Sequence, residues 1–145
     1  MNYKPDELSY PFHLAFPVAD LEKTIWFYGD VLECDIGRRS TRWVDFNFFG
    51  HQLSAHLRPD ELSDTHKNPV DGHNVPVRHF GVILDMDRWN ILKKRLEELE
   101  ISFIIEPYTR FKGKPGEQST MFIKDPSGNA LEFKAFRNWD MIFEK

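Results

Sequence analysis

Two histidines and one glutamate occupy matching positions in three segments that the sequence predicts to be β-strands. His13 lies in FHLAFPV, His79 begins HFGVIL, and Glu132 lies in ALEFKAF. Alternate residues of a strand share a face, so the bulky apolar residues of each segment fall on one face and the polar residue on the other. A small residue shares the polar face in each case, which leaves room for a cavity. These small residues are Ala15, Gly81 and Ala130.

Two neutral imidazoles and one carboxylate that converge form a metal-binding set. Such a set leaves open positions on an octahedral ion, and it is the usual arrangement around non-haem Fe(II), with sites for substrate and O₂. A lone histidine in a strand is also commonly a structural residue held by a hydrogen bond. The pattern predicts a 2-His-1-carboxylate site built from His13, His79 and Glu132, with the structural interpretation as the alternative.

A fourth predicted strand, residues 52–57, follows the same alternation and places Gln52, Ser54 and His56 on the cavity face. If His56 is a fourth ligand, the site would suit Zn²⁺, Ni²⁺ or Co²⁺ and favour Lewis-acid or proton-transfer chemistry. His56 could instead be a catalytic acid or base, which requires hydrogen-bond reach to the proton that moves. A structural role beside Ser54 is the third interpretation.

The loop YTRFKGKPGEQS, residues 108–119, combines basic residues with two glycines. It could close over a cavity and meet an anionic substrate through Arg110 and Lys112, with Tyr108 and Gln118 as hydrogen-bond donors. Gln52, on the cavity face, is a further candidate for substrate contact. A solvent-exposed hairpin loop is the alternative interpretation of residues 108–119.

The elements that must position these residues form two similar halves. The apolar runs 12–18 and 80–84 are each followed by a helical pattern, for which Asp20 and Asp87 are candidate N-caps. Further strands follow each helix, so the chain is predicted to be an α+β protein of two βαβββ modules. The predicted strands after the helices are residues 42–49, 52–57, 101–105, 120–124 and 130–136.

A length of 145 residues fits a single domain made of two small modules. Module one covers about residues 12–58 and module two about 78–136. The polar segment at about 59–77, which contains three prolines and a glycine, is interpreted as a linker or a lid. Residues 137–145 form a C-terminal tail.

Composition excludes several classes of function. The net charge of −4 argues against binding to nucleic acid or to a membrane surface, since such proteins usually carry a basic stripe. The single cysteine, Cys34, excludes an internal disulfide and a thiolate zinc site. The sequence has no signal-peptide pattern and no apolar run long enough to span a membrane. We therefore expect a cytoplasmic protein with a small-molecule substrate.

The motifs resemble the vicinal oxygen chelate superfamily, which includes glyoxalase I, extradiol catechol dioxygenases, fosfomycin-resistance thiol transferases and bleomycin-resistance proteins. The resemblance covers about residues 12–136 and rests on His13 followed by DLEKTIWFYGDVLE, on His79 in RHFGVIL and on Glu132 in DPSGNALEFKAF. It implies a curved eight-stranded half-barrel with helices on the outer face, and it places His13, His79 and Glu132 on the three ligand positions. An optional fourth ligand lies on the strand at residues 52–57, where glyoxalase I has glutamate and this chain offers His56 or Gln52.

The segments FFGHQLSAHL and FIIEPYTRFKGKPGEQSTMFIKDPSGNALEF are similar to a bacterial subgroup described as predicted extradiol-type dioxygenases. The resemblance implies an enzyme with a divalent metal ion, with Fe(II) favoured and Mn, Zn or Ni as alternatives. The second interpretation is a glyoxalase-like isomerase or lyase, or a thiol transferase, that uses the ion as a Lewis acid. The third is a non-catalytic drug-binding resistance protein, although bleomycin-binding members lack the metal residues. A homodimer is expected, with the metal site within one chain or shared between two.

Overall fold

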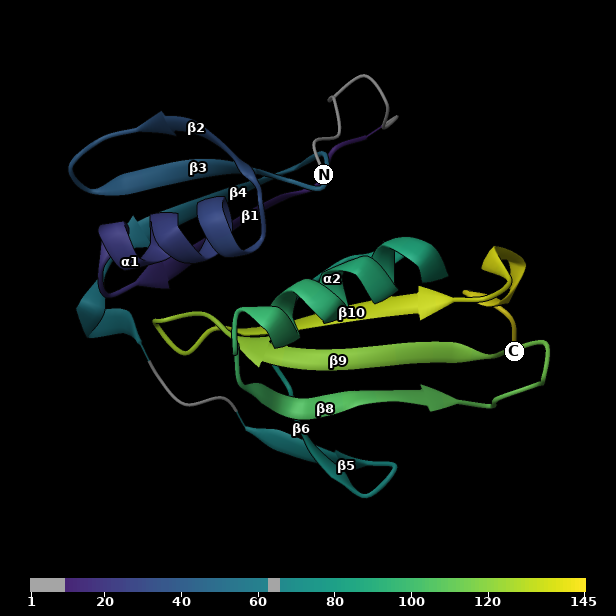
Figure 1. Cartoon of the computed structure of the whole chain (residues 1–145). Helices are drawn as coiled ribbons and strands as arrows, with labels where there is room; N and C mark the ends of the chain where they lie inside the picture. Colours follow the sequence, from purple (N-terminus) through teal and green to yellow (C-terminus); the bar gives the residue numbers. More distant parts are fainter. Residues whose placement is uncertain (1–9, 63–65) are drawn as a thin grey trace. The chain divides into compact units, whose positions relative to one another are not determined.

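The computed structural model describes residues 10–62 and 66–145, and the chain divides into two compact units. Unit 1 contains the described residues up to 62 together with Asp125–Gly128, and unit 2 contains residues 66–124 and Asn129–Lys145. Each unit holds a four-stranded sheet with a helix against one face (Figure 1). The prediction of an α+β fold with βαβββ modules is confirmed, and neither sheet is closed.

Unit 1 is built from one βαβββ repeat. Its sheet has the strand order β1-β4-β3-β2, with β1 parallel to β4 and the other neighbours antiparallel. The sequence pattern does not predict β2, because this edge strand is exposed along its whole length and shows no apolar alternation. The elements are β1 (His13–Val18), α1 (Leu21–Ile25), η2 (Trp26–Val31), β2 (Asp35–Arg39), β3 (Trp43–Phe48), β4 (His51–Leu57) and η3 (Pro59–Glu61).

The helix of unit 1 begins at the predicted cap and ends in a wider turn. The Asp20 side chain accepts a hydrogen bond from the backbone N–H of Lys23 at 2.9 Å, as an N-cap should. After Ile25 the helix continues as η2, a π-helix in which Leu32 N donates to the Phe27 carbonyl at 3.0 Å. This stretch carries the large buried residues of the helix, which are Phe27, Tyr28 and Val31.

Tyr28 ties a distant turn of the chain into unit 1. Its hydroxyl donates to Asp125 Oδ2 at 2.9 Å, and both residues are buried. Ser127 of the same turn accepts a hydrogen bond from Ala19 N at 2.9 Å. The turn DPSG therefore packs with unit 1, although it connects two strands of unit 2.

The segment that the sequence analysis assigned to a linker contains a β-hairpin. Its strands are β5 (Lys67–Val70) and β6 (His73–Pro76), which pair in antiparallel register. Asp71 and Gly72 both have positive φ, 49° and 78°, as the two central residues of a type I′ turn require. An Asp-Gly pair between short extended runs thus specifies a hairpin here. Residues 63–65 of the predicted linker lie outside the described residues.

Unit 2 repeats the arrangement with a shorter first strand. The order is β7-β10-β9-β8, with β7 parallel to β10. The segment before β7 already follows β10, because Phe80 N donates to the Ala130 carbonyl at 3.2 Å and Glu132 N donates to the Phe80 carbonyl at 2.9 Å. The elements are β7 (Ile83–Leu84), α2 (Met86–Glu98), β8 (Phe103–Arg110), β9 (Gln118–Lys124), β10 (Ala130–Phe136) and η4 (Trp139–Met141).

Helix α2 begins before the predicted cap. The N-cap is Asp85, whose carboxylate accepts a hydrogen bond from Arg88 N at 2.8 Å, so the prediction of Asp87 was wrong. Two aspartates stand at the start of this helix, and only Asp85 has the extended backbone of a cap (φ −67°, ψ 161°). Asp87 lies in the first turn, where its negative charge favours the positive end of the helix dipole.

The alternation predicted for the last strand is confirmed in β10. Leu131, Phe133 and Ala135 are completely buried, while Glu132 and Lys134 between them are partly exposed. Each large apolar side chain that is buried in this way contributes about 2 kcal/mol to stability. Strand β10 therefore presents one apolar face to the core of unit 2 and carries its polar residues on the other.

Candidate metal centre

The structure brings His79 and Glu132 together in unit 2. Glu132 lies on β10, and His79 lies in the segment that follows β10 up to β7. His79 Nε2 is 3.0 Å from Glu132 Oε2, and the two side chains are 27% and 12% exposed. Two of the three predicted ligands are therefore neighbours, in a position that a small ion can reach from solvent.

A glycine makes this approach feasible. A Cβ atom on Gly81 would lie 1.5 Å from the backbone oxygen of Glu132. Any side chain at this position would therefore push the segment that carries His79 away from β10. Gly81 is a small residue of the predicted cavity face, but its structural role is to let two backbones pass in close contact.

Hydrogen bonds fix the orientation of the His79 ring. The carbonyl oxygen of Pro76 lies 2.6 Å from Nδ1, and because a carbonyl can only accept, Nδ1 carries a proton. Nε2 is then the nitrogen available to a metal ion, as in many metal-binding histidines. The hydrogen bond with Glu132 raises the pKa of His79 above its ordinary value, and burial only partly offsets this effect.

The Glu132 carboxylate is held by two further groups. Thr120 Oγ1 donates to Oε1 at 2.7 Å, and Lys134 Nζ lies 3.8 Å from the same oxygen. Burial opposes ionisation, but the hydrogen bonds from His79 and Thr120 outweigh it, so the pKa of Glu132 lies below its ordinary value. The sequence analysis missed Thr120, because its place beside Glu132 depends on the pairing of β9 with β10.

His13 lies in unit 1, on the exposed side of β1. The sheet register pairs His13 with Gln52 on β4, and Gln52 with Asn47 on β3, so these residues form one row across the sheet. His56 pairs with Pro17, which is four residues or about 13 Å along β1 from His13. The residue of β4 that lies beside His13 is therefore Gln52, and His56 belongs to a separate row.

A buried hydrogen bond separates the two rows. Ser54 Oγ donates to Asp45 Oδ1 at 2.6 Å, and both residues are buried. Ala15 completes this middle row by pairing with Ser54. Ser54, which the sequence analysis offered as a structural partner for His56, thus uses its hydroxyl to satisfy the Asp45 carboxylate.

Two of the predicted substrate contacts have partners within unit 2. Asp71, at the turn of the β5-β6 hairpin, accepts a hydrogen bond from the Tyr108 hydroxyl at 3.2 Å and pairs with Arg110 Nε at 2.6 Å. The ring of His73 stacks on Tyr108 with centroids 4.9 Å apart. Tyr108 and Arg110 therefore hold the hairpin against β8. Asp71 and His73 were not predicted as their partners, since this contact joins segments far apart in the sequence.

Two further predicted substrate contacts are Lys112, in the loop between β8 and β9, and Gln118, on β9. Lys112 lines a cavity of about 350 Å³ in unit 2, together with Trp89 and Asn90 of α2. Gln118 is at the start of β9, opposite Arg110 on β8 and Phe136 on β10. The positions of Lys112 and Gln118 do not show whether these residues bind substrate, so both assignments stay predictions.

The distance between the two side chains is compatible with binding to one metal ion. Two ligands bound at about 2.1 Å and at right angles are about 3.0 Å apart, which is the separation of His79 Nε2 and Glu132 Oε2. Within residues 10–62 and 66–145, no three histidine, cysteine, aspartate or glutamate side chains gather at one point. His79 and Glu132 are therefore neighbours joined by a hydrogen bond, and the assignment of His13, His79 and Glu132 as metal ligands stays a prediction.

Comparisons with known proteins agree on one family. A sequence profile of the Glyoxalase/Bleomycin resistance protein/Dioxygenase superfamily matches residues 11–133. The crystal structure of a glyoxalase/bleomycin resistance protein/dioxygenase from Alicyclobacillus acidocaldarius is 34% identical in sequence, with a TM-score of 0.73. The match covers 93% of this chain and 97% of that one.

Two other solved structures share the fold at lower identity. Lactoylglutathione lyase from Agrobacterium tumefaciens is 23% identical, with a TM-score of 0.65 and coverage of 91% of this chain and 97% of its own. A fosfomycin resistance protein from Listeria monocytogenes is 16% identical, with a TM-score of 0.67 and coverage of 88% and 93%. In the described part of the chain, every helix is too short or too polar to cross a membrane. The profile match over most of the sequence and the 34% identity show that the chain belongs to the Glyoxalase/Bleomycin resistance protein/Dioxygenase superfamily, the vicinal oxygen chelate proteins.

Proposed function

We propose that the chain is a metal-dependent enzyme that acts on a small molecule with two adjacent oxygen atoms, and specifically an extradiol-type dioxygenase. The ligands would be His79 and Glu132 of unit 2 and His13 of unit 1, from the same chain or from a second copy. The observation that carries the proposal is the 3.0 Å separation of His79 Nε2 and Glu132 Oε2, which suits adjacent ligands of one ion. Membership of a superfamily that includes lyases and dioxygenases supports an enzyme of this class.

The surrounding residues prepare the two ligands. Pro76 keeps the proton on His79 Nδ1, so that Nε2, the nitrogen facing Glu132, is the one that would bind the metal. Thr120 holds one oxygen of Glu132, which leaves the other oxygen on the side of His79. A bound Fe(II) ion would supply a chelation point for two neighbouring substrate oxygens and an electron source for O₂. Three protein ligands would leave coordination positions open for both molecules.

A lyase or isomerase that uses the ion as a Lewis acid is the second candidate. It is favoured by Gln52, which lies beside His13 in the sheet and has an amide oxygen that could act as a fourth ligand. A site with four protein ligands suits Zn²⁺ or Ni²⁺ with a bound water. Gln52 is neutral and a weaker ligand than a carboxylate, so we favour the three-ligand dioxygenase.

Metal analysis of full-length protein without a histidine tag tests the proposal. The protein is stripped of metal and reloaded anaerobically with Fe(II), Mn(II), Zn(II) or Ni(II), and bound metal and catechol-dependent O₂ uptake are measured. We expect stoichiometric Fe(II) and O₂ consumption that requires both the metal and the catechol. Stoichiometric zinc or nickel without O₂ uptake would support the second candidate. Failure to bind any of the ions would overturn both and leave a binding protein.

Substitution of the three ligands tests their assignment. We expect His13→Ala, His79→Ala and Glu132→Gln each to lower the affinity for the metal by at least about tenfold, with an unchanged circular dichroism spectrum. His66→Ala and Glu97→Gln are matched controls, because both residues are exposed. Unfolding of all three ligand variants would favour the structural interpretation of these residues.

A further inference from the structure

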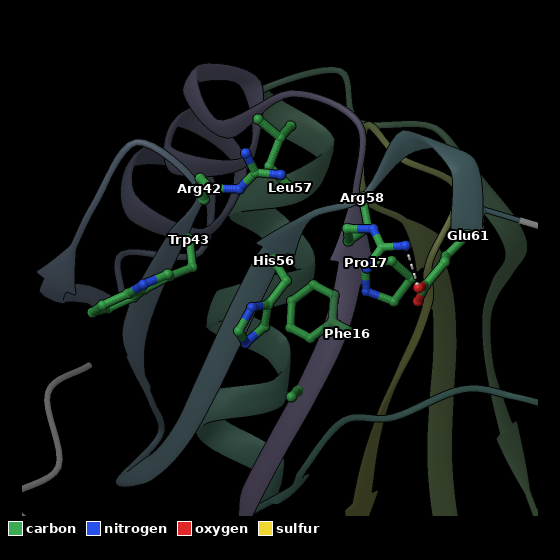
Figure 2. A pocket seen from close by; sticks show the side chains of 9 residues that line it. Phe16, Pro17, Arg42, Trp43, His56, Leu57, Arg58 and Glu61 are labelled. Carbon is green, nitrogen blue, oxygen red and sulfur yellow. Dashed lines mark ion pairs between the residues drawn. The ribbon is translucent and has the colours of Figure 1, made fainter.

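Unit 1 contains a cavity at one end of the sheet face that carries His13. Its volume is about 480 Å³, and it is lined by residues of β1, β3, β4 and η3 (Figure 2). The sheet register builds its floor, since Trp43, His56 and Pro17 are direct neighbours on three adjacent strands. The lining of the cavity runs along β1 from Pro17 to Ala15, which is two residues from His13, and does not include His13 itself.

Two flat aromatic rings stand on the floor of the cavity. Trp43 is half-buried and His56 is exposed, and the two residues are cross-strand neighbours whose Cβ atoms are about 5 Å apart. Figure 2 shows the imidazole of His56 with the indole of Trp43 on one side and the rings of Phe16 and Pro17 on the other. Rings that stand side by side on an open sheet face offer planar apolar surface, and a planar ligand ring can cover this surface.

The positive charges of the cavity differ in their partners. Arg58 is already compensated, because its guanidinium lies 2.9 Å from both Asp60 and Glu61. The Arg42 guanidinium has no ion pair with any residue in the described part of the chain. The Arg42 backbone is fixed, since its carbonyl accepts a hydrogen bond from Leu57 N at 2.7 Å. Arg42 thus brings an available positive charge to the lining of the cavity, and Figure 2 shows its guanidinium beside Leu57.

We infer that this cavity binds an aromatic carboxylate. The ring of the ligand packs against Trp43 and His56, and its carboxylate pairs with Arg42. At the other side of the cavity, Arg58 is already paired with Glu61, and the Glu61 carboxylate repels a second negative group. The carboxylate of the ligand therefore lies at the Arg42 side. The site needs no metal ion and goes beyond the proposed oxygenase chemistry.

A titration of metal-free, full-length protein with benzoate tests this inference. The indole N–H signals of the four tryptophans are followed by NMR in ¹⁵N-labelled protein, and the signal of Trp43 is assigned with Trp43→Phe. We expect saturable shifts of the Trp43 signal, while those of Trp26, Trp89 and Trp139 stay in place. Benzamide, which lacks the charge, and acetate, which lacks the ring, should bind at least about tenfold more weakly.

The Arg42→Gln variant should weaken benzoate binding by at least about tenfold. Arg38→Gln is the matched control, because Arg38 is an exposed arginine of β2 that does not line the cavity, and it should bind benzoate like the wild type. Equal affinity for benzoate and benzamide, unchanged binding by Arg42→Gln, or no saturable Trp43 shift would each overturn the inference. Because the protein is metal-free throughout, none of these results bears on the metal proposal.

Discussion

Thr120 shows how a single hydroxyl can decide which way a carboxylate faces. The side chain is 6% exposed and donates to Glu132 Oε1 at 2.7 Å. With this oxygen held, the other oxygen stays 3.0 Å from His79 Nε2. Groups that orient a metal ligand in this manner often affect metal affinity almost as much as the ligands themselves.

We therefore expect Thr120→Val to lower the affinity for Fe(II) or Mn(II) by about tenfold, because valine keeps the shape of threonine but cannot donate. Thr120→Ser should restore most of the affinity. The measurement is metal titration by calorimetry, with the circular dichroism spectrum as a check of folding. Thr109→Val is the matched control, since Thr109 bonds to Ser119 and not to Glu132. Wild-type affinity in Thr120→Val would contradict this role.

For single residues, the sequence predicted which face of a strand a side chain occupies, but not which residue of the adjacent strand lies beside it. Strand alternation correctly placed His56 and Gln52 on the same face of β4. Which of them lies beside His13 depends on the register between β1 and β4, strands that are separated by the whole of the first helix and two further strands. A local pattern carries no information about that register, so the choice between His56 and Gln52 needed the structure.

Among the contacts between elements, the one between β10 and the segment that carries His79 leaves no room for an added side chain at Gly81. A Cβ atom at Gly81 would lie 1.5 Å from the Glu132 carbonyl oxygen. That oxygen belongs to a rigid strand, so the space can only be made by moving one backbone away from the other. Such overpacking commonly costs about 1–3 kcal/mol.

We expect Gly81→Ala to lower the free energy of unfolding by about 3 kcal/mol and to weaken metal binding, because His79 moves with its segment. The measurements are urea unfolding and metal titration on the same preparation. Gly116→Ala is the matched control, because the nearest atom to its added Cβ is a flexible methionine end at 3.8 Å, and its stability should be almost unchanged. Equal stability of the two variants would show that the close approach is not needed.

Signals within one element were easier to interpret than pairings between elements. The cap at Asp20 and the alternation of β10 follow from local chemistry, and both were predicted. The β5-β6 hairpin was missed because composition outweighed the Asp71-Gly72 turn signal in the interpretation of residues 59–77. Its attachment to β8 through Asp71 and Arg110 could not be predicted, since nothing in either segment identifies the other as its partner.

For the whole molecule, the proposed ligand set has an energetic consequence. His13 belongs to unit 1, whereas His79 and Glu132 belong to unit 2. An ion that binds all three would stabilise both units at once, whether the units come from one chain or from two. At a free metal concentration of about 100 times the dissociation constant, the gain in stability is about 2.7 kcal/mol.

Hydrogen exchange with and without Mn(II) measures this coupling. We expect amide exchange to slow in β4 of unit 1 and in β10 of unit 2 when the ion binds to the wild-type protein. In His13→Ala, only unit 2 should respond, and His66→Ala should behave like the wild type. Slower exchange confined to unit 2 in the wild-type protein would remove His13 from the ligand set.

The buried bond between Tyr28 and Asp125 bears on how such a chain can be divided. The donor lies in the first helix, while the acceptor follows β9, near the end of the chain. A fragment cut after the first repeat would lose this acceptor and leave a phenol hydroxyl inside its core without a partner. The two repeats are therefore not independent domains in sequence, because the first half of the chain does not contain all of unit 1.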